Sequence, residues 1–180
     1  ISALEDEIRK QATNITEFHS MEILHQHDIP VNPGILVNDA ESVVKAAERL
    51  NYPVALKIQS ADIPHKSSAG GVALNLTGKD EVVTSFNTII QNIKNNKPKA
   101  SIDGILVQKM VEPGLEVILG ITNKDGFGPI LMVGFGGTGV EASGDVAFAL
   151  CPVTPKKCEN LLGALKLSLI HISEPTRQKP

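Results

Sequence analysis

The sequence from position 54 to position 76 reads Val54-Ala-Leu-Lys-Ile-Gln-Ser-Ala-Asp-Ile-Pro-His-Lys-Ser-Ser-Ala-Gly-Gly-Val-Ala-Leu-Asn-Leu76. Its two ends, residues 54–58 and 72–76, are short apolar runs, which predict a buried strand and its hairpin partner or near neighbour. The loop between them is rich in glycine, serine and lysine, residue types that can surround a phosphate with backbone N–H groups, hydroxyls and positive charge. We therefore expect the chemistry of the protein in this loop.

Lys57 lies inside the first apolar run. A lysine in a buried strand is costly unless its ammonium group meets an anion or a carboxylate, and a phosphate would serve. A loop of glycine, serine and lysine is by itself more often a solvated hairpin loop, but Lys57 favours an anion site. The sequence contains no G-x-x-x-x-G-K-S/T motif, so the loop is not a P-loop.

His65 is the only histidine in the loop. Imidazole has an unperturbed pKa of about 6.5 and can act as a nucleophile and phosphoryl carrier, although a lone loop histidine is more often a surface residue. His19, His25 and His27 lie on or beside the first expected helix and are given no role. Gly134-Phe-Gly-Gly-Thr-Gly139 matches G-x-G-x-x-G but lacks the βαβ context of a dinucleotide site, which favours a turn near the nucleotide or a hairpin.

The composition argues against two classes of function, nucleic-acid binding and membrane binding. The 180 residues, 42% of them hydrophobic, suffice for one domain or one and a part, and a net charge of −3 with few aromatic residues disfavours a nucleic-acid partner. No apolar window is long enough to cross a membrane and no signal peptide is evident, so we expect a cytoplasmic protein without a membrane partner. Cys151 and Cys158 indicate reduced thiols, and no residue is assigned as a metal ligand.

Helices and paired strands alternate along the chain, which predicts a mixed α+β fold. Apolar spacing predicts helices near residues 16–27, 39–50, 81–93 and 155–165, the first capped by Thr16 and the second by Asp39. Apolar runs predict further strands at residues 35–37, 102–110, 115–122 and 129–133, the last three as a meander.

Four segments also occur in a specific order. They are Leu56-Lys-Ile58, His65-Lys-Ser67 with Gly70-Gly-Val72, Gly104-Ile-Leu-Val-Gln-Lys-Met-Val111 with Leu115-Glu-Val-Ile-Leu-Gly120, and Phe127-Gly-Pro-Ile-Leu-Met-Val-Gly-Phe-Gly-Gly137. This set resembles the ATP-grasp region of ADP-forming acyl-CoA synthetases, the family of acetate–CoA ligase, which is related to the succinyl-CoA synthetase beta subunit. The likeness covers about residues 16–166.

The resemblance implies an ATP-grasp fold, a two-lobed nucleotide clamp truncated at its C-terminal side, and it implies roles for individual residues. His65 would shuttle the phosphoryl group between a partner domain and ADP. The residues implied to bind the nucleotide are Lys57 at the phosphates, Lys66, Ser67, Gly70 and Gly71 in the loop over them, Gln108, Met110 and Val111 against adenine, and Glu116 near the ribose.

The implied reaction is acyl-CoA plus ADP plus phosphate giving a carboxylic acid, CoA and ATP, through an acyl phosphate and a phosphohistidine. ATP or ADP and Mg²⁺ would be the cofactors, with the Mg²⁺ ligands expected beyond the end of this chain. The acid and CoA would bind to CoA-binding and ligase domains of the same enzyme, fused or separate, and we expect this chain alone to be inactive. Ser68 stands where the family usually has an acidic residue, which removes one possible orienting partner of His65.

The expected domain boundaries follow from the same resemblance. Residues 1–13 indicate a linker or the tail of a preceding domain, and residues 14–166 an incomplete ATP-grasp domain. Residues 167–180 begin with Leu167-Ser-Leu-Ile-His-Ile-Ser-Glu-Pro-Thr-Arg177, which reads as a translated sequencing adapter, so we expect an artefact there.

Two other functions stay open. One is a regulatory acyl-CoA-synthetase-like module of a protein acetyltransferase, against which the presence of His65 argues. The other is an ATP-grasp enzyme similar to biotin carboxylase or to peptide ligases, which lack this histidine because they transfer phosphate directly to a carboxylate.

Overall fold

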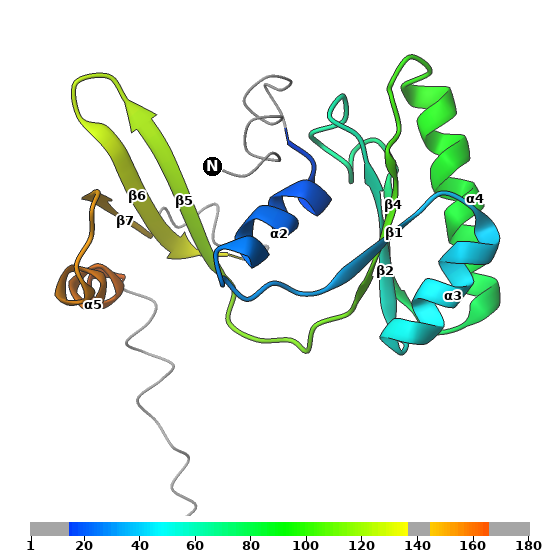
Figure 1. Ribbon diagram of the computed structural model, residues 1–180, viewed down its shortest axis with the longest axis horizontal. Coiled ribbons are helices and arrows are strands. Elements are labelled where there is room, and N and C mark those ends of the chain that lie inside the picture. Colours follow the sequence, from blue (N-terminus) through cyan, green and yellow to red (C-terminus); the bar gives the residue numbers. More distant parts are fainter. Residues whose placement is uncertain (1–14, 137–144, 166–180) are drawn as a thin grey trace, which may run out of the picture. The chain divides into compact units, whose positions relative to one another are not determined.

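The computed structural model describes residues 15–136 and 145–165 (Figure 1). The chain divides into two compact units, residues 1–112 and 113–180. The expectations for residues 1–13 and 167–180 lie outside the described residues, as does the end of the glycine motif from position 137 onward.

Unit 1 is built on a four-stranded antiparallel sheet in the order β1-β4-β2-β3. Its strands are β1 (Gly34–Val37), β4 (Gly104–Lys109), β2 (Val54–Gln59) and β3 (Val72–Leu76). The predicted pairing of the two strands around the loop is confirmed, with Lys57 opposite Val72. Lys57 lies opposite Leu106 on the other side.

The predicted meander of three strands after residue 102 is wrong at its first strand. β4 does not continue into the following strands but lies between β1 and β2 in the sheet of unit 1. Ile105, Leu106 and Val107 are completely buried. A strand that is apolar on both faces is stable in the middle of a covered sheet, and its sequence does not reveal which strands will flank it.

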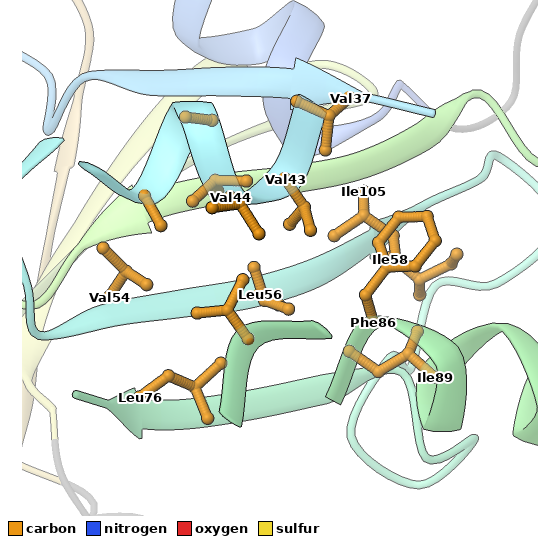
Figure 2. Packing of buried hydrophobic residues seen from close by; sticks show 14 of the residues in the cluster. Val37, Val43, Val44, Val54, Leu56, Ile58, Leu76, Phe86, Ile89 and Ile105 are labelled. Carbon is orange, nitrogen blue, oxygen red and sulfur yellow. The ribbon is translucent and has the colours of Figure 1, made fainter. Parts of the chain in front are cut away.

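Helices α3 (Ala40–Leu50) and α4 (Lys79–Asn96) pack on one face of this sheet. Figure 2 shows the apolar contacts between them and the strands. α3 begins where predicted, because the Asp39 side chain accepts a hydrogen bond from the Ser42 backbone N–H at 2.8 Å. α4 is longer than the predicted helix 81–93, and the residues that it adds at both ends are outside the apolar stripe of Val82, Phe86, Ile89 and Ile93.

Helix α2 (Glu17–Gln26) lies on the opposite side of the sheet from α3 and α4 (Figure 1). The predicted cap is confirmed, since the Thr16 side chain accepts from the His19 N–H. None of the helical residues is buried. Hydrogen bonds join α2 to the sheet instead, among them a bond from the Phe18 N–H to the Gln59 side-chain oxygen at 3.0 Å. This face of the sheet also carries Lys57, so α2 lies beside the expected functional residues.

The described residues of unit 2 form the antiparallel sheet β5-β6-β7 and the helix α5. Its elements are β5 (Val117–Lys124), β6 (Gly128–Phe135), β7 (Val146–Leu150) and α5 (Pro155–Ala164). The predicted last helix is confirmed, with the Thr154 side chain as its cap. β7 was not predicted from the sequence. A small core joins β6 and β7 to Leu161 and Leu165 at the end of α5.

No helix in the described parts of either unit is both long and apolar enough to cross a membrane.

Candidate functional site

The loop between β2 and β3 is fixed at two buried anchors. Ile63 and Ala69 are only 2% and 7% exposed and belong to the core under α3 and α4. The Asn92 side chain on α4 donates to the Gly70 carbonyl oxygen at 3.2 Å. Between these anchors His65 is exposed to solvent. The residues between Ile63 and Ala69 thus form a short polar loop tip that is anchored in the core at both ends.

The tip borders an open pocket of about 650 Å³. The pocket brings together residues from helix α2, strand β2, the loop and strand β3: Glu17, Lys57, Pro64, His65, Lys66, Ser67, Ser68, Val72 and Leu74. Four of the predicted site residues, Lys57, His65, Lys66 and Ser67, therefore meet in one place.

Glu17 is the carboxylate that meets Lys57. Its two carboxylate oxygens accept from the Lys57 Nζ at 2.7 Å and from the Lys66 Nζ at 2.9 Å. Burial by itself would raise the pKa of Glu17, but the hydrogen bonds and positive charges of Lys57 and Lys66 outweigh burial and hold the pKa below its ordinary value of 4.5. Glu17 is thus ionised at neutral pH and bridges the two lysines.

Sequence reasoning missed Glu17. The residue follows the cap Thr16 directly, and an acidic side chain in the first turn of a helix is common because it favours the helix dipole. Because the helix dipole already accounts for an acidic residue at this position, the sequence does not indicate that Glu17 contacts the two lysines. The only available signal was the need of the buried strand lysine for a partner of opposite charge.

The two loop glycines shape the backbone behind the tip. The Gly71 N–H donates to the Lys66 carbonyl at 2.8 Å and the Gly70 N–H to the Ser67 carbonyl at 3.1 Å. Their N–H groups close the loop. In the described part of unit 1, the backbone N–H groups of Lys66, Ser67 and Ser68 donate no hydrogen bond. The donors open to an anion are thus at the tip.

Ser68 turns toward the backbone. Its hydroxyl donates to the His65 carbonyl oxygen at 3.0 Å. Within residues 15–136 and 145–165, no side chain makes a hydrogen bond to the His65 imidazole. The ring is therefore exposed at the pocket without an orienting partner from these residues.

Gln108 lies on the same sheet face as Lys57, two positions further along the paired strands. Its side-chain nitrogen donates to the Asn32 carbonyl at 3.1 Å and approaches the Met21 sulfur at 3.4 Å. Its Oε1 is buried and has no hydrogen-bond partner among the described residues. This orientation leaves an unpaired acceptor beside α2.

The remaining predicted residues, Met110, Val111 and Glu116, are close in sequence to the division between the two units after residue 112. The Met110 N–H donates to the Pro53 carbonyl at 2.9 Å, and Val111 is 69% exposed. Glu116 belongs to unit 2, where its carbonyl accepts from the Gly136 N–H at 2.8 Å. The structure therefore groups Gln108 and the pocket residues in unit 1, whereas Glu116 is described only within unit 2.

Residues 6–179 match the ATP-grasp domain family. The chain belongs to the ATP-grasp family. This result confirms the resemblance and the fold expected from it. ATP-grasp domains bind ATP or ADP, so the pocket with its paired lysines belongs to a nucleotide-binding domain.

Two relatives of this ATP-grasp chain are ADP-forming ligases. It is 41% identical over 162 residues to 4-hydroxybutyrate–CoA ligase (ADP-forming) of Nitrosopumilus maritimus, covering 89% of this chain and 23% of that protein. It is 38% identical over 152 residues to the beta subunit of acetate–CoA ligase (ADP-forming) I of Pyrococcus furiosus, covering 84% of this chain and 66% of the subunit. The chain thus spans less than two thirds of either relative.

Solved structures of one related enzyme are also similar. The dinucleotide forming acetyl-coenzyme A synthetase 1 of Ca. Korarchaeum cryptofilum, in complex with coenzyme A, Ca-AMPCP and HgCl+, superimposes with a TM-score of 0.84 at 35% identity, covering 91% of this chain and 71% of that one. A second structure, with Mg-AMPPCP, has a phosphohistidine segment pointing towards its nucleotide binding site. It has a TM-score of 0.73 at 31% identity and covers 91% and 69% of the two chains.

Proposed function

We propose that this chain is the nucleotide-binding and phosphoryl-transfer module of an ADP-forming acyl-CoA synthetase. The whole enzyme would convert acyl-CoA, ADP and phosphate into a carboxylic acid, CoA and ATP. The observation that carries the proposal is the pocket, which is lined by Lys57, Lys66 and the exposed His65. The two relatives of the chain described above are ligases of this class.

The phosphates of ADP would bind at the loop tip. Lys57 and Lys66 supply positive charge, and the backbone N–H groups of Lys66, Ser67 and Ser68, which donate to none of the described residues, supply donors. Gly70 and Gly71 hold the loop in the closed turn that this requires. Phosphoryl transfer depends mainly on positioned charge of this kind, because the transition state is stabilised electrostatically.

The adenosine part of the nucleotide would lie further along the same sheet face. The Oε1 of Gln108, which has no hydrogen-bond partner among the described residues, is an acceptor suited to the amino group of adenine. Met110 and Val111 follow the end of β4 and offer apolar contact to the base.

His65 would carry the phosphoryl group to and from ADP. In the direction of ATP synthesis, an oxygen of the β-phosphate of ADP attacks phosphorus, an O–P bond forms and the N–P bond of the phosphohistidine breaks. The imidazole leaves with the electron pair of that bond and then takes up a proton. The exposure of His65 fits a group that must also meet a donor held by another domain.

Mg²⁺ would neutralise phosphate charge when bound. In the portion of the chain that the structure describes, no group of three or more His, Cys, Asp or Glu side chains could hold a metal ion. The described residues therefore do not supply such a cluster, and no step assigned to this chain depends on one. CoA and the carboxylic acid would bind to other domains, as the partial coverage of the relatives allows.

The proposed transfer of a phosphoryl group through His65 can be tested by labelling the protein with phosphate from ATP. The whole enzyme that contains this chain is incubated with Mg²⁺ and ATP labelled at its γ-phosphate, because we expect the chain alone to be inactive, and an acid-labile, alkali-stable label should appear on the protein, as a phosphohistidine gives. His65→Asn should abolish the label, whereas His25→Asn, which changes an exposed histidine of α2, should keep it.

The outcome separates the candidate functions. A label that survives in His65→Asn would contradict the relay. Bound nucleotide without any label would favour a regulatory module, or a ligase that transfers phosphate directly to a carboxylate.

A further inference from the structure

Two positively charged groups converge on one carboxylate at the pocket. The Glu17 side chain is 29% exposed, and those of Lys57 and Lys66 are 28% and 21% exposed. Lys57 comes from the middle of β2, Lys66 from the loop tip, and Glu17 from the first turn of α2. Elements that are far apart in sequence thus contribute one charge each to a compact triad.

We propose that Glu17 is a positioning residue of the nucleotide site, which holds the ammonium groups of Lys57 and Lys66 ready for the phosphates and remains in place when they bind. This inference rests on the proposed function, because it assumes that the two lysines bind phosphate.

The hydrogen-bond capacity of the lysines supports this role. An ammonium group has three N–H donors, and each lysine uses one on Glu17. Two donors on each lysine remain for phosphate oxygens. The triad of Glu17, Lys57 and Lys66 keeps one net positive charge, so it still attracts an anion.

The cost of assembling the site gives a second argument. Without Glu17 the two half-buried ammonium groups would repel each other, and their long flexible side chains would turn to solvent. Immobilising rotamer-rich side chains at the moment of binding lowers affinity, whereas a site that is already ordered avoids this cost. A carboxylate between the lysines orders them before the nucleotide arrives.

Glu17 itself is held firmly. The Thr16 side chain caps the helix on one side of it, and the Phe18 N–H on the other side donates to the buried Gln59 side chain. The carboxylate is thus fixed from both neighbours along the backbone. Such support is unnecessary for a solvent-exposed helix residue and is expected for a residue with a defined geometric task.

Calorimetric titration with ADP in the presence of Mg²⁺ tests the inference. Glu17→Gln keeps the size of the side chain but removes its charge, and we expect about tenfold weaker binding, because a neutral amide has one acceptor oxygen in place of two and makes weaker hydrogen bonds to the lysines than a carboxylate does. Glu22→Gln changes an exposed carboxylate on the same helix and should leave the affinity unchanged. Glu17→Asp retains the charge but is one methylene shorter, and should give an intermediate affinity.

Stability against pH provides a readout that does not need the nucleotide. The charged groups facing Glu17 are Lys57 from β2 and Lys66 from the loop, with His65 at the same pocket and His19 on its own helix. The pKa of Glu17 is lowered by folding, so its contribution to stability is complete above the ordinary pKa of 4.5 and is lost as the pH falls through the lower pKa of the folded state. The stability difference between the unmodified chain and Glu17→Gln should shrink over that acidic range. Glu22→Gln should show no such trend.

The results separate this inference from the proposed function. Tight ADP binding by the unmodified chain with equal or stronger binding by Glu17→Gln would overturn the inference alone, because Glu17 would then be dispensable or a competitor of phosphate. No ADP binding by the unmodified chain would overturn the proposed function, and the inference with it. A pH-independent stability difference would also contradict the inference, since the bridge would not exist in solution.

Discussion

The backbone N–H of Phe18 donates to the side-chain oxygen of Gln59 at 3.0 Å, across 41 positions of sequence. Gln59 is completely buried at the end of β2, and its side-chain nitrogen donates to the Ile58 carbonyl at 3.0 Å. Its oxygen is thereby turned toward α2. This bond connects the first turn of α2, which carries Glu17, to the strand that carries Lys57.

Gln59→Leu should loosen α2. Leucine has a similar volume but no acceptor, so the Phe18 N–H loses its partner in a partly buried place. We expect the free energy of unfolding to fall by about 1–3 kcal/mol. Hydrogen exchange should become faster at the Phe18 amide while the amides of β4 remain protected. Gln91→Leu is the matched control, because Gln91 is exposed on α4 and its side chain donates to Asn95 on the same helix. Unchanged exchange at Phe18 in Gln59→Leu would show that the bond does not hold α2.

Gly71→Ala should disturb the loop. A methyl group at this position would run into the Ile58 side chain and come within 3.1 Å of the Lys66 carbonyl. Overpacking of this kind costs about 1–3 kcal/mol in stability. Thermal unfolding measured by circular dichroism checks this loss, and ADP binding should weaken as well because Lys66 is displaced.

Gly78→Ala is the control for Gly71→Ala. Gly78 precedes α4 with an extended backbone, and a methyl group there meets nothing within 4 Å. Gly78 is the N-cap of α4, and alanine is a poorer cap than glycine, so the free energy of unfolding should fall by no more than about 1 kcal/mol in the absence of a steric clash. If Gly71→Ala and Gly78→Ala melt alike, the close packing of Gly71 against β2 is not needed for the fold.

The local pattern of the sequence predicted the part of the fold that carries the site. Residues 54–76 alternate between two apolar strands and a polar loop, and the strands do pair with Lys57 opposite Val72. Such a hairpin-like unit is defined by contacts between residues close in sequence. Caps at Thr16 and Asp39 were equally predictable, because a cap bonds to a backbone group within three residues.

Contacts between distant residues were not predictable in this way. The neighbours of β4 depend on how the whole sheet assembles, so its apolar sequence indicated a strand but not its place. The partner of Lys57 is 40 positions away, on a helix whose own pattern gave no reason to single out Glu17. The glycines at positions 70 and 71 signalled a tight loop correctly, but only the structure shows that their N–H groups close it.

Calorimetric titration of the chain with ADP and Mg²⁺, compared with the variant Lys57→Met/Lys66→Met, tests the central claim most directly. We predict saturable binding by the unmodified chain and at least about tenfold weaker binding by the double variant, since each lysine contributes charge-assisted hydrogen bonds to the phosphates. Lys45→Met, which removes an exposed lysine paired with Glu41 on α3, should bind like the unmodified chain. Equal affinity of the unmodified chain and the double variant, or no binding by either, would contradict the assignment of this pocket to the nucleotide phosphates.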